Sequence, residues 1–552
     1  MATGYGPASR TSRKLITRRR FSEIVGGAVA SVGVLGCETT RRSAPAGAPA
    51  RKEDSITGSH APHNPNILII HCDELRVDCL GAYGNREIQT PHVDALAADG
   101  VRFENHFCSY PVCTPSRYSL LSGLPVHDHQ GWSNYCTLPP GTETIPGLLK
   151  NVGYRTAAAG KMHFTPTYLD VGFERMVLAE QDGPGRWDDD YHRDLRAAGL
   201  IDVNDIEDQR SEYRRKAPRE YWENCGALPS NLPREWHSTE WVARHALREI
   251  DGWGAGGNML MAGFVKPHHP FDPPKELCDL YDPEKISLLA GWTPECLPHD
   301  LETNKGYFPN AGLTEPIMRR VTAYYYATIH HIDIQVGRIV ELLKRKGIYD
   351  DTLIVFTADH GDNMGYHHML LKGSYMYEPM AKIPLIIKYP RSRDKGTVYT
   401  GLTINTDVAP TLLRQAGVAP GARMAGIDLA RDRNGRSLVY GEAALGKEFM
   451  VRSDRYKLIQ DRKRQRSFFY DLKKDPYELV NCYGDTTHRS QIAPLEKALN
   501  AWAANVHEPK AFLDENAPEI PQPNVPKKNN GHREAMIAYS QEKVSEYRRV
   551  AK

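Results

Sequence analysis

The chain has 552 residues, enough for several structural units and too many for one minimal module. Lysine and arginine total 70 and aspartate and glutamate total 68, a net charge of +2. The first 36 residues hold six bases and one acid, so the rest lacks the basic excess of a general nucleic-acid binder. Ten cysteines without a CxxC pair exclude a dense disulfide scaffold and argue against thiol-bound zinc.

The N-terminus has the pattern of an export signal. Thr-Arg-Arg-Arg-Phe at residues 17–21 precedes an uncharged run, residues 24–36, rich in glycine, alanine and valine. At 1.5 Å per residue this run is shorter than a hydrocarbon layer of roughly 30 Å, so it does not predict a transmembrane helix. The paired arginines resemble a twin-arginine signal. We expect residues 1–36 to direct bacterial export to the periplasm or cell surface; the alternative is a basic tail before a chance apolar stretch.

A lipobox-like sequence ends this run. Val-Leu-Gly-Cys at residues 34–37 resembles a site at which the chain is cleaved and the new N-terminal cysteine, Cys37, is acylated. Ala-Pro-Ala at residues 48–50 is an alternative cleavage site. Residues 37–64 contain much alanine, proline, glycine and serine, and they predict a flexible tether before the folded body.

Four short apolar runs in the body are each followed by charged or imidazole side chains. The runs are residues 66–72, 156–159, 259–265 and 352–357. The side chains after them are Asp73 and Glu74, Lys161 and His163, Lys266 and His268, and Asp359 and His360. Ligands bind beyond the carboxyl ends of strands in open parallel sheets, so we expect one shared crevice. The pattern predicts an α/β fold with a large mixed, mainly parallel sheet flanked by helices.

The pattern in the second half of the body predicts a long helix followed by short strands. Residues 321–346 have a helical pattern that ends in basic residues and Gly347. Two strand-like runs, residues 449–460 and 467–472, predict a small antiparallel sheet. We therefore expect an α+β subdomain over residues 447–510 and a polar tail over residues 511–552.

Cys-Thr-Pro-Ser-Arg at residues 113–117 marks a helix start. Pro115 suits the first helical turn and Gly123 suits the stop. A group at position 113 would therefore meet the free N–H groups and positive dipole end that favour an anion. The alternative is a buried cysteine beside a helix cap.

Residues 65–485 resemble the type I, formylglycine-dependent sulfatases of the alkaline-phosphatase-like superfamily. The resemblance rests on the CxPxR signature at residues 113–117, on Gly-Lys-Met-His at 160–163, Lys-Pro-His-His-Pro at 266–270 and Thr-Ala-Asp-His-Gly-Asp at 357–362, and on Lys372 with Gly373. It implies a catalytic domain over residues 65–446. It also implies that a formylglycine-generating enzyme oxidises Cys113 to formylglycine (3-oxoalanine).

The residue types suit a sulfate ester. Such an ester is an anion, and Arg117, Lys161 and Lys372 can supply positive charge in a partly dry crevice. The carboxylates of Asp73, Glu74 and Asp359 would repel one another unless a divalent cation neutralises them. Oxygen ligands favour a hard ion, calcium or magnesium, and the family precedent is calcium.

The resemblance also implies roles in the reaction. The hydrated aldehyde at position 113, itself in contact with the metal, would attack sulfur through one hydroxyl. His268 resembles the acid that protonates the leaving oxygen, and His163 the base that removes a proton from the second hydroxyl and so releases sulfate. Imidazole suits either role because its pKa is near neutrality.

The metal positions depart from the commonest family pattern. Glu74 stands where many relatives have aspartate, and His360 where many have asparagine. Aspartate followed by histidine, here Asp359 and His360, is similar to the choline-sulfatase and phosphonate-monoesterase branches, and an imidazole ligand admits manganese or zinc as alternatives.

Three further polar side chains lie in or near the motifs and need an interpretation of their own. His367 matches a recurrent family histidine and is a candidate substrate contact. Lys266 is either a contact for a substrate carboxylate or a cap at its strand end. His71, inside an apolar strand, is expected to be a core residue.

Three functional hypotheses follow. The first is hydrolysis of a sulfate monoester on a sulfated small molecule or glycan, with a carbohydrate as the expected substrate. The second is a phosphonate monoester or phosphodiester hydrolase built on the same site, because phosphorus and sulfur oxyanions share tetrahedral geometry. The third is a non-catalytic lipoprotein that binds sulfated glycans.

Overall fold

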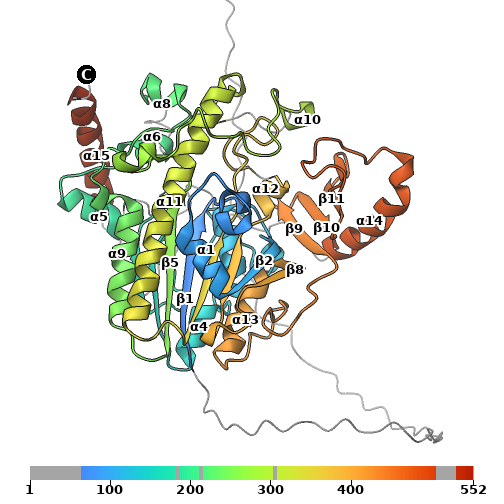
Figure 1. The fold of residues 1–552 in the computed structure, drawn as a ribbon, viewed down its shortest axis with the longest axis horizontal. Coiled ribbons are helices and arrows are strands. Elements are labelled where there is room, and N and C mark those ends of the chain that lie inside the picture. The colour runs from blue at the N-terminus through green and yellow to red at the C-terminus, as the bar shows by residue number, and fades with distance from the viewer. Residues whose placement is uncertain are drawn as a thin grey trace, which may run out of the picture. The chain divides into compact units, whose positions relative to one another are not determined.

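The computed structural model (Figure 1) describes residues 64–181, 187, 189–209, 216–301, 307–373, 375–504, 506 and 530–550. The expected export signal, the lipobox with Cys37 and all of the expected tether except residue 64 lie outside the described residues. Among the helices in these ranges, none combines the length and apolarity needed to cross a membrane.

The main sheet has eight strands in the order β4-β3-β5-β1-β6-β7-β2-β8. The strands are β1 (Asn66–Asp73), β2 (Val101–Phe107), β3 (Arg155–Gly160), β4 (Arg175–Leu178), β5 (Asn258–Pro267), β6 (Thr352–Ala358), β7 (Leu385–Lys388) and β8 (Thr397–Ile404). Only β7 runs antiparallel to its neighbours, β6 and β2. The expected mixed, mainly parallel sheet is confirmed.

The four predicted strands are neighbours in this sheet. The runs before Lys161, Lys266, Asp73 and Asp359 form β3, β5, β1 and β6, which lie side by side and parallel. Every residue of β1 is buried, as its unbroken apolar run predicts for a strand covered on both faces. The carboxyl ends of these strands therefore meet at one edge, where their polar side chains gather.

Helices cover both faces of the sheet (Figure 1). Leu68 and Ile70 of β1 pack in a core with residues of α1 (Pro91–Asp99), α9 (Ser238–Asp251) and α11 (Glu315–Arg345). Ile67 and Ile69 point the other way, into a core with α2 (Cys113–Ser122), α4 (Ile145–Asn151) and α13 (Val408–Gln415). Alternation along one strand thus supplies two hydrophobic layers.

The long helix α11 begins earlier than the sequence pattern predicts. It starts at Glu315 rather than at residue 321, with Thr314 at the N-cap position, whose side chain makes no capping hydrogen bond, and with Pro316 in the first turn, where a missing N–H costs nothing. Its end at Arg345, followed by Gly347 with φ 66°, agrees with the predicted stop. Shorter helices complete the domain: α3 (Val126–His129), α5 (Asp190–Ala197), α6 (Val203–Gln209), α8 (Arg219–Glu223), α10 (Pro298–Leu301) and α12 (Glu378–Ala381).

The C-terminal sheet has four antiparallel strands in the order β12-β11-β10-β9. They are β9 (Val439–Ala443), β10 (Glu448–Arg452), β11 (Tyr456–Asp461) and β12 (Ser467–Asp471), and α14 (Arg489–Ala503) packs on them. The first predicted run is two strands, because the polar Ser-Asp-Arg at residues 453–455 forms a turn. The sheet also begins at Val439, before the expected start of the subdomain.

The polar C-terminal segment contains a helix, α15 (Asn530–Val550). Its Met536 and Val544 pack in a small apolar cluster with Trp187, Ile201 and Ile206. Among the described residues nine cysteines are present and all are free thiols, so this part of the chain holds no disulfide.

Candidate active site

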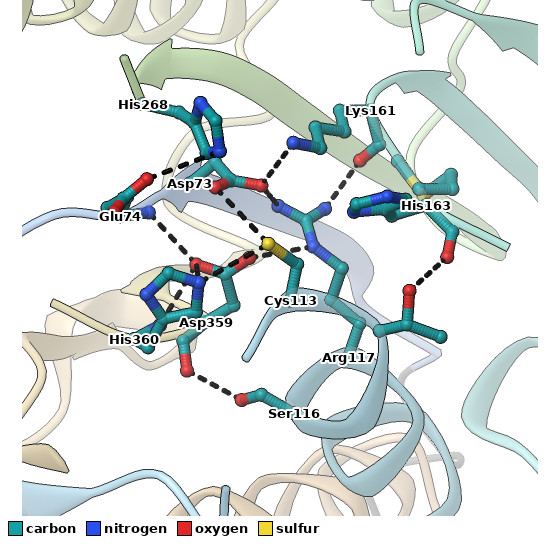
Figure 2. Close-up of polar contacts among 12 residues, drawn as sticks. Asp73, Glu74, Cys113, Ser116, Arg117, Lys161, His163, His268, Asp359 and His360 are labelled. Carbon is teal, nitrogen blue, oxygen red and sulfur yellow. Dashed lines mark hydrogen bonds and ion pairs between the residues drawn. The ribbon is translucent and has the colours of Figure 1, made fainter. Parts of the chain in front are cut away.

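The polar side chains at the four strand ends converge around the start of α2 (Figure 2). Cys113 is the first residue of that helix and is fully buried. Its Sγ lies 3.7 Å from Asp73 Oδ1, 3.3 Å from His360 Nε2 and 3.3 Å from Lys372 Nζ. The expected nucleophile position therefore faces an acid, an imidazole and an ammonium group.

Hydrogen bonds on α2 fix the position of Cys113. Ser116 Oγ donates to the carbonyl oxygen of Asp359 at 2.6 Å, and Asn405 Nδ2 donates to Ser116 Oγ at 3.1 Å. The N–H of Thr114 donates to Asn134 Oδ1 at 3.1 Å. The start of the helix is thus attached to the end of β6, which carries Asp359.

A buried ion network lies beneath Cys113. Arg117, one helical turn along α2, places Nη2 2.8 Å from Asp73 Oδ2 and Nε 2.9 Å from Asp359 Oδ2, and Lys161 Nζ lies 2.9 Å from Asp73 Oδ2. Burial would raise the pKa of Asp73, but Lys161 and Arg117 outweigh it and hold this pKa well below its usual range. Asp73 is therefore an anion at neutral pH. Desolvation makes such buried ion networks weak contributors to stability. A role in the chemistry of the site is therefore the better explanation for the network around Asp73.

Four side chains around Cys113 are spaced to hold a metal ion. One atom each of Asp73, Cys113, Asp359 and His360 lies within 4.8 Å of the others. His360 Nδ1 donates to the carbonyl of Gly361 at 2.8 Å, which leaves Nε2 to face Cys113. Asp359 Oδ1 accepts the N–H groups of Glu74 at 3.0 Å and His360 at 2.9 Å.

Glu74 adds an oxygen that lacks a protein partner. Its Oε1 is buried and, among the described residues, makes no hydrogen bond. Burial raises the pKa of Glu74 to about 8, with Lys372 lowering it and Asp362 raising it further. Asp73, Glu74 and His268 form a second set of potential ligand atoms within 4.8 Å. A buried, unsatisfied carboxylate oxygen beside this cluster fits a bound cation.

His268 and Lys372 meet at Glu74. His268 Nδ1 donates to the carbonyl oxygen of His269 at 2.5 Å, so Nε2 faces Glu74 Oε2 at 3.3 Å. Lys372 Nζ lies 3.5 Å from the same carboxylate oxygen and also contacts His268 Nε2. Lys372 is 22% exposed whereas Glu74 is buried, so Lys372 stands at the open side of the site.

His163 is held through its backbone by a residue that sequence reasoning missed. Its N–H donates to both carboxylate oxygens of Glu180, at 3.0 and 3.1 Å, and the N–H of Met162 donates at 3.1 Å. Thr114 Oγ1 donates to the carbonyl of His163 at 2.7 Å, which attaches this loop to the start of α2. Burial raises the pKa of Glu180 to about 8. His163 has φ 56°, a strained backbone that these bonds stabilise.

Gln181 is a second missed residue. Its Oε1 lies 3.1 Å from Lys161 Nζ, and its Nε2 donates to the carbonyl of His269 at 2.6 Å. Both Glu180 and Gln181 follow the short edge strand β4, which the sequence pattern does not reveal. No local motif identifies them, because their importance comes from contacts with β3 and β5.

His367 and Lys266 make other contacts than the expected ones to substrate. Both ring nitrogens of His367 are used, Nδ1 at 3.1 Å from Asp300 Oδ2 and Nε2 at 2.8 Å from the carbonyl oxygen of Tyr477. Lys266 is buried, pairs with Asp272 and donates to the carbonyl of Pro270 at 2.7 Å. His367 thus joins two segments of the chain and Lys266 secures the loop after β5, while a contact of either side chain with substrate stays a prediction.

His71 is a core residue, as expected. It is fully buried in β1, and burial lowers its pKa to about 3, so the ring is neutral. A neutral ring below the ion network adds no charge to the site.

Comparisons with known proteins agree with this geometry. The family profile described as Sulfatase matches residues 65–418, and the profile N-sulphoglucosamine sulphohydrolase, C-terminal, matches residues 365–505. An arylsulfatase of Clostridium perfringens is 30% identical over 471 residues, which covers 79% of this chain and 93% of that protein. An N-acetylglucosamine-6-O-sulfatase of Bacteroides thetaiotaomicron is 26% identical over 480 residues, covering 79% of this chain and 85% of that protein.

A solved structure gives the same fold. The phosphonate monoester hydrolase of Agrobacterium radiobacter matches with a TM-score of 0.66 and 24% identity, over 83% of this chain and 100% of that chain. The expected alkaline-phosphatase-like architecture and the expected sulfatase activity class are both confirmed. With most of the main domain matched by one profile and a relative aligned over nearly its whole length, the chain belongs to the sulfatase family.

Proposed function

We propose that this protein hydrolyses sulfate monoesters and that residue 113, oxidised from cysteine to formylglycine, is the nucleophile. The observation that carries the proposal is the position of Cys113, whose Sγ lies between Asp73, His360 and Lys372 at the start of α2. As a hydrated aldehyde, this residue would supply a hydroxyl group for attack on sulfur. The helix start adds N–H groups and a favourable dipole for the anionic ester.

Positive side chains account for binding of the sulfate group. Lys372 lies 3.3 Å from Cys113 Sγ at the open side of the site, where it can contact an ester oxygen. Arg117 and Lys161 lie deeper and hold Asp73 as an anion. In a crevice with little water, these charges act more strongly on a transition state than they would in bulk solvent.

One divalent cation completes the proposed site. Asp73, Asp359 and His360 would hold it together with Glu74, whose Oε1 lacks a protein partner among the described residues. The cation would supply positive charge opposite the ester and lower the pKa of a hydroxyl group beside it. Calcium is the expected ion because oxygen donors predominate, with magnesium or manganese as alternatives.

Two histidines would move protons. His268 Nε2 faces the site beside Lys372 and Glu74, and we propose that it protonates the leaving oxygen. His163 lies on the loop fixed by Glu180 and Thr114, and we propose that it accepts a proton from residue 113 when sulfate leaves. The two imidazoles follow different strands, β5 and β3, and Gln181 links the segments that carry them through Lys161 Nζ and the carbonyl of His269.

The proposed substrate is a sulfated carbohydrate. The relative from B. thetaiotaomicron is named for N-acetylglucosamine 6-sulfate, and the profile matched over residues 365–505 is named for a sulfated glucosamine. A phosphonate monoester is the second candidate, because the A. radiobacter enzyme shares the fold and the resemblance at Asp359 and His360 favours that branch. Parallel assays of matched aryl sulfate, phosphonate monoester and phosphodiester substrates distinguish the two.

Burial of Cys113 bears on maturation. The side chain is fully buried, so a formylglycine-generating enzyme would have to reach it before folding is complete. A twin-arginine route exports folded proteins, which places oxidation in the cytoplasm and the finished enzyme in the periplasm or at the cell surface, with a lipid anchor at Cys37 as a further proposal. Replacing Arg18 and Arg19 with lysine should retain active protein in the cytoplasm; normal secretion of this double mutant would contradict the route.

Mass spectrometry of the tryptic peptide that contains residue 113 tests the central proposal. We expect an aldehyde or its hydrate in place of the thiol in protein made with the maturation enzyme, together with release of free sulfate from aryl sulfates. An unmodified thiol and no sulfate release would contradict it. Full retention of biological activity by Cys113→Ala would instead favour the non-catalytic glycan-binding hypothesis.

A further inference from the structure

A cavity of about 390 Å³ opens beside Lys372. The segment after β6 forms one wall, and His299 of α10 forms part of the next. The C-terminal sheet supplies the opposite wall with Glu448 of β10, Phe468 of β12 and Arg466, which directly precedes β12. The volume falls in the range of small-ligand sites, about 300–1,000 Å³. Because Lys372 also contacts Cys113 Sγ, the cavity continues from the reaction centre.

Two charged side chains in this cavity have unused hydrogen-bonding capacity. The Arg466 guanidinium lies 3.8 Å from Asp461 and 3.9 Å from Glu448, too far for hydrogen bonds, and it makes none with the described residues. The Glu448 carboxylate likewise makes no hydrogen bond with these residues, although its side chain is only 11% exposed. A donor group and an acceptor group therefore face the same space, paired with each other at 3.9 Å and with hydrogen-bonding capacity left over.

The rest of the lining is mixed: it includes aromatic rings, the apolar Met376, Ala444 and Ile459, and the carboxylate of Asp300. The Phe468 ring lies 5.0 Å from the ring of His299, and Tyr375 stacks on Tyr377 at 6.0 Å. Aromatic faces pack well on the C–H face of a ring, whereas a carboxylate and a guanidinium bind hydroxyl groups, which both donate and accept hydrogen bonds. A simple aryl ester would satisfy the rings and leave the hydrogen-bonding capacity of both charged groups unused. A cyclic polyol satisfies both kinds of lining.

We propose that this cavity binds the leaving group as a neutral sugar ring, with its hydroxyl groups on Glu448 and Arg466 and its face on Phe468. The proposal rests on the sulfatase function proposed above and deepens it, because it assigns the C-terminal sheet to substrate selection. A ring seated here has its sulfate directed to Lys372 and residue 113. The charged pair distinguishes sugar esters from aryl esters, since only the former have hydroxyl groups for it.

The test measures selectivity in the full chain carrying formylglycine. The substrates are 4-nitrophenyl sulfate and a panel of N-acetylglucosamine 6-sulfate, galactose 6-sulfate, glucose 6-sulfate and N-acetylgalactosamine 4-sulfate, with free sulfate as the readout. For the best sugar, Glu448→Met and Arg466→Met should each lower the ratio of its kcat/KM to that of 4-nitrophenyl sulfate about tenfold, the effect of one lost hydrogen bond. The matched control is Arg464→Met, because Arg464 lies on the same turn but binds Asn500 outside the cavity.

Each outcome has one meaning. A selective fall for Glu448→Met and Arg466→Met, without one for Arg464→Met, supports the sugar site. Equal changes in both substrate types, or no change, would overturn it while leaving the sulfatase proposal intact. Hydrolysis of 4-nitrophenyl sulfate with no activity on any sugar of the panel would also overturn it. Failure of the wild-type protein, with formylglycine verified, to release sulfate from any substrate would contradict the proposed function itself.

Discussion

The Glu180 carboxylate holds the backbone of His163, accepting its N–H at 3.0 and 3.1 Å. His163 has a left-handed backbone conformation, φ 56°, that a residue with a side chain adopts only when its surroundings enforce it. Glu180 is itself fixed, because its N–H donates to Asp189 Oδ2 at 2.8 Å. A chain of buried carboxylates thus positions the proposed base without contacting its ring.

Removing this support should lower turnover. Glu180→Ala frees the loop that carries His163, and we expect kcat for 4-nitrophenyl sulfate to fall about 10- to 100-fold with little change in KM, because displaced catalytic groups lose rate more than binding. Glu180→Gln retains an acceptor oxygen and should recover most of the loss. Glu174→Ala is the control, since Glu174 accepts the N–H of Thr156 near the start of β3, at the opposite end of the strand from His163. Equal kcat in Glu180→Ala and wild type would refute the positioning role.

Glu180 also predicts a pH dependence of stability. Burial raises its pKa in the folded protein to about 8, above the usual 4.5, so the folded state holds a proton that the unfolded chain loses. This contribution to stability is fully present below about pH 4.5 and is lost as pH rises to about 8. Glutamine at position 180 does not titrate. The thermal midpoint of Glu180→Gln should therefore rise relative to that of the wild type as the pH increases from 5 to 8. A constant difference between the two midpoints across this range would contradict the shift.

The sequence predicts the residues that line the site better than the residues that hold them in position. Residues such as Asp73, Lys161 and Asp359 are visible because each follows an apolar run, and parallel pairing of β3, β5, β1 and β6 then brings them together. Glu180 and Gln181 follow β4, a four-residue edge strand with partly exposed residues, whose apolar run of three residues, 176–178, is shorter than those before the other site residues. Their contacts depend on how β4 aligns with β3, and that register is a tertiary property.

The contacts of His367 show a second limit of prediction from local sequence. Its family motif is visible in the sequence, but the partners that occupy both ring nitrogens, Asp300 and Tyr477, come from segments 67 and 110 residues away. Likewise, the first C-terminal run is predicted as one strand because both of its ends contain apolar residues, while the turn at the polar residues 453–455 divides it. Local pattern identifies residue types, and long-range packing decides which of their atoms remain available.

The buried ion network makes a prediction about Arg117. Its Nε and Nη2 bind Asp359 and Asp73, and its Nη1 donates to the carbonyl of Lys161 at 2.6 Å. Lysine has one ammonium group and cannot reach all three acceptors, so Arg117→Lys should lower the free energy of unfolding by about 3 kcal/mol. Urea unfolding measures the loss. The exposed pair of Arg219 with Glu223 on α8 is the control, and Arg219→Lys should have little effect. A similar small effect for Arg117→Lys would mean that the network is not required for folding.

Cation binding can be measured without turnover. Asp73, Asp359 and Glu74 gather buried carboxyl groups beside His360, so a divalent cation that binds only the folded state should raise the thermal midpoint. We expect EDTA to lower the midpoint of the full chain, and calcium to restore it at lower concentration than magnesium. Asp359→Asn should reduce this calcium-dependent rise, whereas Asp282→Asn, at an exposed carboxylate paired with Lys285, should not. Calcium-dependent rises of equal size in both variants would place the cation elsewhere, and restoration by manganese before calcium would assign the site to the softer ion that His360 favours.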